Sequence, residues 1–170
     1  MEGMIEMIGP NIEKAINEQI NAELFSAYIY KAMSAYFASE NLMGMSRWMD
    51  IQSEEEMSHA MKFYDYLVER GGRVKLTALE EPPFEWDSPL SVFEAAYEHE
   101  QYISSRINHL TDLAISEKDH ATNIMLQWFV SEQVEEEAHA EEIVNKLKMI
   151  SESRHGLYML DRELGAREAD

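Results

Sequence analysis

The first candidates for a chemically active site in this sequence are a glutamate and a histidine that lie three residues apart, Glu56 and His59. On a helix this spacing places both side chains on the same face. That face is otherwise apolar, because Trp48, Met49 and Phe63 recur around the pair at helical spacing. Burying an unpaired charge in such a face costs several kcal/mol, so a carboxylate there needs a partner. The pattern predicts that other polar groups and a cation share the site.

Polar side chains also interrupt the apolar stripes of the other three long helical segments. They are Glu23, Glu100, Gln133 and Glu136. Together with Glu56, the glutamates carry four negative charges, which two divalent cations would neutralise. Oxygen ligands combined with one imidazole and open positions suit Fe(II) or Mn(II), and they suit Zn(II) less well. The pattern therefore predicts a pair of metal ions inside a helix bundle, with redox chemistry at iron.

A second interpretation needs no metal. A single glutamate in a helical stripe is usually a boundary residue whose carboxylate reaches solvent, and Glu-x-x-His is common by chance in an acidic helix. Four interruptions, one in each long segment, favour the metal site over a purely structural bundle with protonated or solvated acids. Tyr30 follows Glu23 on the same face and is expected, from the pattern alone, to be a core residue. Four further histidines are expected at the surface, namely His99, His109, His120 and His155.

Glycine and proline residues divide the chain into four long segments and one short segment, each with helical periodicity. The predicted helices cover residues 11–39, 45–70, 89–117, 120–150 and 157–164. Ser88 followed by Pro89 is typical of a helix start, because serine caps the first turn and proline has no amide hydrogen to satisfy. No segment has the alternating pattern of a β-strand. The expected fold class is all-α, with a single domain over residues 1–170.

The lengths of the connections predict how the helices are arranged. The first and second predicted helices are joined by a short turn, as are the third and fourth, so each pair should be antiparallel. The connection over residues 71–88 is long, and an extended chain covers about 3.3 Å per residue whereas a helix rises about 1.5 Å per residue. This connection can therefore cross the whole bundle and make the second and third helices parallel. The prediction is a four-helix bundle with one long crossover and a short fifth helix, which is the connectivity of the ferritin-like fold.

The chain is strongly acidic, with a formal charge of -19 from 14 basic and 33 acidic residues. This charge argues against nucleic acids and anionic membranes as partners and favours cations. The absence of cysteine excludes disulfides, iron–sulfur clusters held by cysteine and cysteine-based zinc sites. The sequence has no signal-peptide pattern over residues 1–10 and no apolar run of about 18 residues. A cytoplasmic protein without a membrane partner is expected.

Several stretches together resemble the prokaryotic non-haem ferritins. They are residues 17–24, 55–59, 68–74, 97–100, 127–137 and 160–164. The resemblance extends over about residues 11–164. It implies a cytoplasmic hollow shell of identical subunits, usually twenty-four, that oxidises Fe(II) with dioxygen or peroxide. Such a shell stores the product as a ferric oxyhydroxide mineral, and its acidic interior would concentrate Fe(II).

The resemblance also implies roles for individual residues. The first iron and the bridge between the two irons would use Glu23, Glu56, His59 and Glu100. The second iron would use Glu56, Glu100 and Gln133. Tyr30 matches a tyrosine beside the site that could donate an electron. An additional iron position would use the acidic residues Glu55, Glu132, Glu135 and Glu136.

Two features keep related di-iron proteins open as alternatives. His139 creates a second Glu-x-x-His with Glu136, as in bacterioferritins and rubrerythrins, and Met57 stands where bacterioferritins bind haem. The stretch over residues 131–137 resembles the non-haem ferritins and places Gln133 and Glu136 at the ligand positions. His139 is therefore interpreted as an accessory or surface residue, and haem is not expected. The alternatives are a bacterioferritin-type protein or a rubrerythrin-like di-iron peroxidase, although the latter usually relies on a cysteine-containing electron-transfer module.

Overall fold

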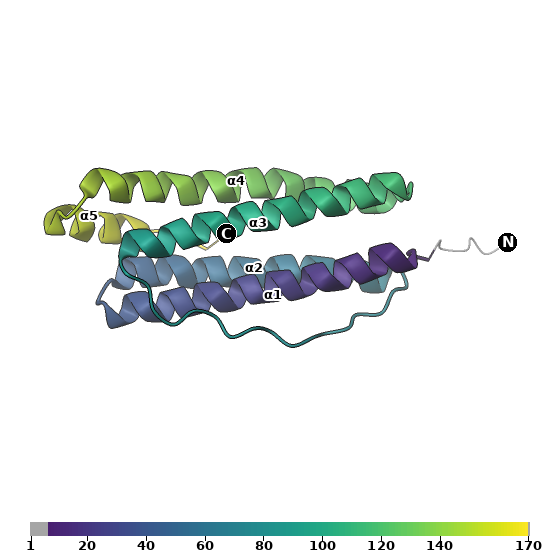
Figure 1. Ribbon diagram of the computed structural model, residues 1–170, viewed down its shortest axis with the longest axis horizontal. Coiled ribbons are helices and arrows are strands. Elements are labelled where there is room, and N and C mark those ends of the chain that lie inside the picture. Colours follow the sequence, from purple (N-terminus) through teal and green to yellow (C-terminus); the bar gives the residue numbers. More distant parts are fainter. Residues whose placement is uncertain (1–6, 170) are drawn as a thin grey trace.

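The computed structural model describes residues 7–169, and all of its regular secondary structure is helical (Figure 1). The helices are α1 (Pro10–Ser39), α2 (Met43–Glu69), α3 (Pro89–Ser116), α4 (His120–Ile150) and α5 (Arg154–Gly165). The predicted all-α class is confirmed. None of the described helices combines the length and the apolar character that a membrane span requires.

The four long helices form a bundle with one crossover connection. Short turns join α1 to α2 and α3 to α4, and each pair is antiparallel. The segment between α2 and α3 runs along the outside of the bundle from one end to the other, so α2 and α3 are parallel (Figure 1). The predicted bundle, with its long crossover and short fifth helix, is confirmed.

The starts of α3 and α4 follow local sequence signals. The Ser88 hydroxyl accepts a 3.1 Å hydrogen bond from the backbone amide of Ser91 at the start of α3. Asp119 caps α4, where its carboxylate accepts from the amide of Thr122 at 3.0 Å. These caps satisfy backbone donors that a helix leaves unpaired in its first turn. Helix α1 begins one residue earlier than predicted, at Pro10, and larger differences occur for α2, which begins at Met43, and α5, which begins at Arg154.

A glycine that lies inside a helix explains one of these differences. Gly44 occupies the first turn of α2, where a Cβ atom would lie 1.8 Å from the backbone oxygen of Asp161 in α5. A Cβ on Gly165 would come within 2.9 Å of Gly44 Cα. The Asp161 side chain accepts a 2.8 Å hydrogen bond from the amide of Met45. Gly44 therefore allows α5 to dock closely on α2 instead of breaking the helix. The chain after α5 continues from the end of the bundle toward its middle (Figure 1).

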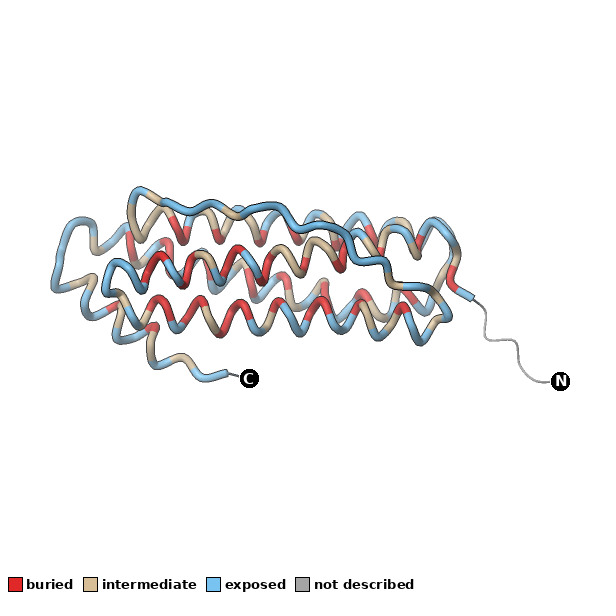
Figure 2. The backbone as a smooth tube through the Cα atoms, turned by 90° about the horizontal axis from the view of Figure 1, so that it is seen from below, coloured by how far each residue is buried: buried red, intermediate tan, exposed pale blue. Residues whose placement is uncertain are grey.

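The hydrophobic core consists of two clusters, one toward each end of the bundle. One cluster includes Phe37, Met49 and Phe93, and the other includes Ile16 and Phe63. Buried positions follow the inward faces of the long helices over most of their length (Figure 2). The layer between the two clusters is polar, although it is buried too. Packing at both ends of the bundle thus holds this polar layer in place.

Candidate metal centre

The polar layer contains all six residues that the sequence predicts at the centre of the site. Each has an exposed fraction of 5% or less. The six are Glu23 on α1, Glu56 and His59 on α2, Glu100 on α3, and Gln133 and Glu136 on α4. One residue or one pair from each long helix therefore meets in the middle of the bundle.

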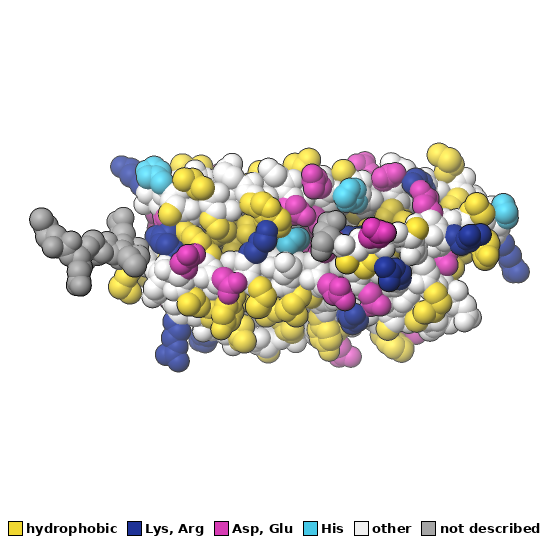
Figure 3. Space-filling view, turned by 180° about the vertical axis from the view of Figure 1, so that it is seen from behind, with side chains coloured by type: hydrophobic (Ala, Val, Ile, Leu, Met, Phe, Trp, Pro, Cys, Tyr) yellow, Lys and Arg dark blue, Asp and Glu magenta, His cyan; other side chains and the backbone are white. Residues whose placement is uncertain are grey.

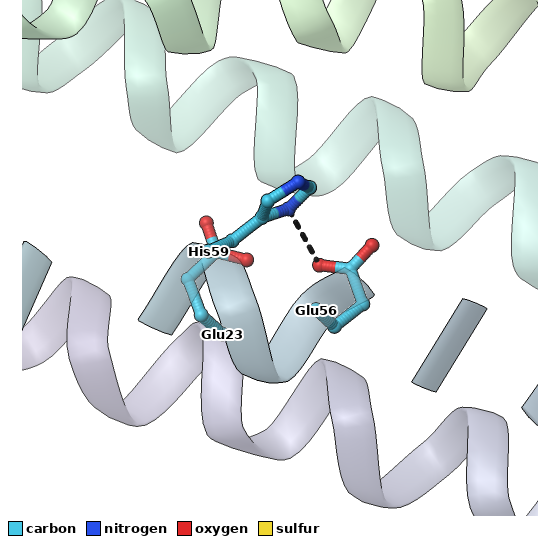
Figure 4. Close-up of side chains that lie close together, drawn as sticks. All are labelled: Glu23, Glu56 and His59. Carbon is cyan, nitrogen blue, oxygen red and sulfur yellow. Dashed lines mark hydrogen bonds and ion pairs between the residues drawn. The ribbon is translucent and has the colours of Figure 1, made fainter. Parts of the chain in front are cut away.

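Ligand atoms in this layer are close enough together to hold metal ions. One oxygen or nitrogen atom from each of Glu23, Glu56 and His59 lies within 4.8 Å of the others, and the three side chains point toward one another from α1 and α2 (Figure 4). The same limit holds for Glu56, Glu100 and Glu136. Because Glu56 belongs to both groups, the geometry offers two adjacent positions that share one carboxylate.

Hydrogen bonds connect the ligand candidates to each other and to their neighbours. His59 Nδ1 lies 3.3 Å from Glu56 Oε2. Glu100 accepts from the Tyr30 hydroxyl at 2.5 Å and from the Gln133 side-chain amide at 3.1 Å. Gln133 thus contacts Glu100 through its nitrogen. Tyr30 is fully buried beside the site, as a core residue whose hydroxyl has a specific partner.

Burial changes the protonation of these groups. It raises the pKa of Glu23 to about 7 and that of Glu136 to about 8, with the Glu100 charge adding to the increase at Glu136. Burial followed by the neighbouring carboxylates also raises the pKa of Glu56 well above its usual range. The pKa of His59 is lowered to about 4, mainly by burial and further by Lys62. His59 is therefore neutral at pH 7 and free to offer a lone pair, and it provides no charge to balance the acids.

One oxygen atom in the site lacks a hydrogen-bond donor within the described part of the chain. Glu23 Oε2 is buried and forms no hydrogen bond among the described residues. Buried polar atoms are nearly always satisfied, so such an atom indicates a missing ligand. A divalent cation between Glu23, Glu56 and His59 would satisfy it and would compensate the clustered carboxylates. The donor set and the unsatisfied oxygen both fit a metal ion.

Two buried glutamines belong to the site but were missed in the sequence. Gln19 donates to Glu23 Oε1 at 2.9 Å, and Gln52 donates to Glu136 Oε2 at 2.6 Å and to Glu56 Oε1 at 3.2 Å. Each glutamine stands four residues before a glutamate of the site, on the same helical face. That spacing was available in the sequence as a signal for both residues.

Each of these glutamines is in turn held by an arginine. Arg106 donates to the side-chain oxygen of Gln19 at 3.0 Å, and Arg167 donates to that of Gln52 at 3.0 Å. In both arrangements the guanidinium donates to the side-chain oxygen of the glutamine, and the side-chain nitrogen of the glutamine donates to a carboxylate. Arg167 follows the last helix, where no periodic pattern could have identified it.

The acidic residues expected at an additional iron position are only partly brought together. His59, Glu132 and Glu136 form a third group of ligand atoms within 4.8 Å. Glu55 instead forms a 2.8 Å ion pair with Arg167. Glu135 is exposed and lies outside all three groups.

An opening of about 230 Å³ reaches the site beside these acids. Its lining residues include His59, Lys62, Trp128, Glu132 and Ala169. The Lys62 ammonium lies 3.0 Å from the centre of the Trp128 ring. Figure 3 shows acidic and basic side chains mixed with exposed hydrophobic ones along the bundle. The opening gives a small ion a route to His59 from the surface.

The other histidines differ in their placement. His109, His120, His139 and His155 are exposed. The expectation of a surface position is wrong for His99, which is largely covered and lies 2.7 Å from the Ser26 hydroxyl. Its ring packs edge-on against Tyr30, with centroids 6.2 Å apart. Burial lowers the pKa of His99 to about 4.

Comparison with known proteins gives the same fold and family. Residues 13–150 match the ferritin-like domain family. The chain is 45% identical over 161 residues to a bacterial non-heme ferritin of Bacteroides fragilis, covering 95% of this chain and 100% of the relative. Identity to a bacterial non-heme ferritin of Escherichia coli is 37% over 158 residues, covering 93% and 96% of the two chains. An open-pore ferritin from Archaeoglobus fulgidus superposes with a TM-score of 0.95 at 53% identity, covering 97% of this chain and 100% of that one. The chain belongs to the ferritin family, and it is similar to the non-haem members of that family.

Proposed function

We propose that the protein oxidises Fe(II) at the buried carboxylate layer and stores the product as a ferric oxyhydroxide mineral inside a shell built from copies of this chain. The observation that supports this most strongly is Glu23 Oε2, an unpartnered buried oxygen within a group of three metal-capable side chains. Four buried glutamates with raised pKa values are costly without a cation, and two Fe(II) ions would neutralise them.

The residues of the site have separate tasks in this proposal. Glu23 and His59 hold the first Fe(II), Glu100 and Gln133 serve the second, and Glu56 is shared between the two. Carboxylates that are partly protonated without metal release their protons when Fe(II) binds. Hard oxygen ligands then favour the more highly charged Fe(III), so the same ligand set promotes the loss of an electron. The electrons pass to dioxygen or peroxide as the oxidant.

We further propose that the shell contains twenty-four subunits and works in the cytoplasm. The described residues leave large hydrophobic side chains exposed, including Phe84, Ile124 and Met149, which would be covered between copies of the chain. A net charge of -19 would draw Fe(II) toward the protein. The absence of cysteine suits a compartment in which thiols and Fe(II) stay reduced.

The test is aerobic addition of Fe(II) to the metal-free protein, followed by near-ultraviolet absorbance of the ferric product and then by sizing. We expect rapid oxidation and a large soluble particle that retains on the order of hundreds of iron ions, as a mineral core would. His59→Ala and Glu56→Ala should slow the oxidation while leaving the particle assembled. Glu69→Ala is the matched control, because Glu69 is exposed on the same helix and does not line the opening beside His59.

Other outcomes separate the competing functions. Saturation at about two irons per chain would indicate a di-iron peroxidase without storage. Oxidation no faster than the buffer control would indicate a bundle whose buried acids serve structure alone. Equal rates in the wild type, His59→Ala and Glu56→Ala would move the reaction to another part of the molecule.

A further inference from the structure

We propose that Arg167, in the segment after α5, is a positioning residue for the metal centre and that it acts through Gln52. The inference rests on the proposed metal centre. It concerns the contacts that hold two of the carboxylates, Glu56 and Glu136, in place before a metal ion arrives.

The guanidinium of Arg167 has several fixed contacts along α2. It donates to the side-chain oxygen of Gln52 at 3.0 Å, to Glu55 Oε2 at 2.8 Å and to the backbone oxygen of Trp48 at 3.3 Å. It also lies over the Trp48 ring, with its central carbon 4.5 Å from the ring centroid. Only 19% of the side chain is exposed. An arginine with partners on so many sides has little freedom to move.

These contacts determine how the Gln52 amide is oriented. A guanidinium has only donors, so the amide group must turn its oxygen toward Arg167. Its nitrogen then faces the opposite way, where it donates to Glu136 at 2.6 Å and to Glu56 at 3.2 Å. Because these glutamates come from α4 and α2, one amide connects carboxylates on two helices. Arg167 therefore reaches the metal centre without touching any of the ligand candidates at its core.

The docking of α5 places Arg167 at this position. The glycine contact between Gly44 and Gly165 and the hydrogen bond from the Met45 amide to Asp161 bring the end of α5 against the start of α2. Arg47 then donates to the backbone oxygen of Arg167 at 3.3 Å. The last segment of the chain is thereby led along α2 to the level of Gln52.

Side chains that hydrogen-bond to metal ligands typically contribute about 10–100-fold to metal affinity. We therefore expect Arg167→Ala to weaken binding of Co(II), used as a spectroscopic probe for Fe(II), by about tenfold. The measurement is an anaerobic titration followed by the visible Co(II) absorption bands, which report ligand geometry, and by calorimetry. Gln52→Ala should have a similar effect. Arg162→Ala is the matched control, because it removes an exposed arginine from α5.

The double variant Arg167→Ala, Gln52→Ala gives the decisive comparison. If Arg167 acts through Gln52, the double variant binds Co(II) as Gln52→Ala does, and Arg167→Lys recovers part of the affinity because an ammonium can still donate to the amide oxygen. Circular dichroism melting of each variant establishes that it is folded. Unchanged Co(II) binding in Arg167→Ala, or additive losses in the double variant, would overturn the inference and leave the proposed function intact. A wild-type protein that binds no Co(II) would overturn both.

Discussion

The hydroxyl of Tyr30 on α1 donates a 2.5 Å hydrogen bond to Glu100 Oε1 on α3, in the layer where the carboxylates meet. Burial and the charge of Glu100 raise the pKa of Tyr30 well above its usual range, so the phenol keeps its proton. The hydroxyl therefore remains a donor to Glu100 at neutral pH. Tyr30 fixes one oxygen of Glu100, and the Gln133 amide fixes the other.

Replacing Tyr30 with phenylalanine tests this contact. Removing the donor leaves a buried carboxylate oxygen unsatisfied, which costs about 1–3 kcal/mol of folding free energy. Loss of an orienting hydrogen bond on a metal ligand should slow Fe(II) oxidation by about tenfold, measured in single-turnover kinetics. Tyr28→Phe is the control, because Tyr28 is exposed on the same helix. Equal rates for the two variants would show that the Tyr30 hydroxyl has no part in the reaction.

Glu23→Gln should improve stability and impair metal binding at the same time. The pKa of Glu23 is raised to about 7, chiefly by burial, so near pH 8 the metal-free protein holds a buried negative charge at this position. A neutral amide removes that charge, and we expect the free energy of unfolding to rise by about 2 kcal/mol. Binding of Fe(II) should weaken in the same variant. Glu18→Gln, at an exposed position on α1, should change neither quantity; a Glu23→Gln protein that is less stable and binds metal normally would contradict the assignment.

Stability of the metal-free protein should depend on pH in a defined direction. Glu23 and Glu136 have folded-state pKa values of about 7 and about 8, above their ordinary value of 4.5. Between pH 4.5 and the folded-state values of about 7 and about 8, the folded state holds protons that the unfolded chain releases. The free energy of unfolding therefore decreases as pH rises through this range. His59 and His99, with pKa values lowered to about 4 from 6.5, act in the opposite direction only below pH 6.5.

The informative range is therefore pH 6.5 to 8. Each proton held only by the folded state lowers the free energy of unfolding by about 1.4 kcal/mol per pH unit there. The measurement is denaturant unfolding in the presence of a chelator. Glu136→Gln should reduce the slope, and a wild-type free energy that stays constant across this range would show that the acids are not protonated in the folded state.

Gly44→Ala should release α5 from the start of α2. The added methyl group would meet the backbone of Asp161, which has no flexible end that could move aside. Forced overpacking of this kind typically costs about 1–3 kcal/mol. Gly9→Ala is the control, since its Cβ would meet only a side-chain oxygen of Glu117 at 3.3 Å. Thermal unfolding of the two variants distinguishes a specific close approach from a general effect of replacing glycine, and equal melting temperatures would refute the close approach.

The sequence predicted the parts of this molecule that follow helical periodicity. Glu23, Glu56, Glu100 and Glu136 could be identified because each interrupts an apolar stripe, and the long connection after α2 determined the topology. The position of Gly44 inside α2 does not follow from its sequence, because a glycine that permits close packing has the same appearance in a sequence as one that ends a helix.

Other residues depend on contacts that no local pattern reveals. Arg167 lies beyond the last helix, and its partner Gln52 is reached only after α5 has docked on α2. His99 is covered because aromatic side chains of α1 and α3 surround it, with Phe25 and Tyr102 both near 6.1 Å between ring centroids. A glutamine four residues before Glu23 and before Glu56 is a signal in the sequence, but a weak one, because glutamine on a helix is so often a solvated residue.

Binding of a pair of iron ions by the buried carboxylate layer is tested most directly by anomalous diffraction from crystals soaked anaerobically with Fe(II). We expect two adjacent iron peaks, one between Glu23, Glu56 and His59 and the other between Glu56, Glu100 and the side chains of α4. The pair should be lost in Glu56→Ala, because Glu56 is shared by both positions. Iron peaks confined to the surface, with none in the layer between the two hydrophobic clusters, would contradict the account.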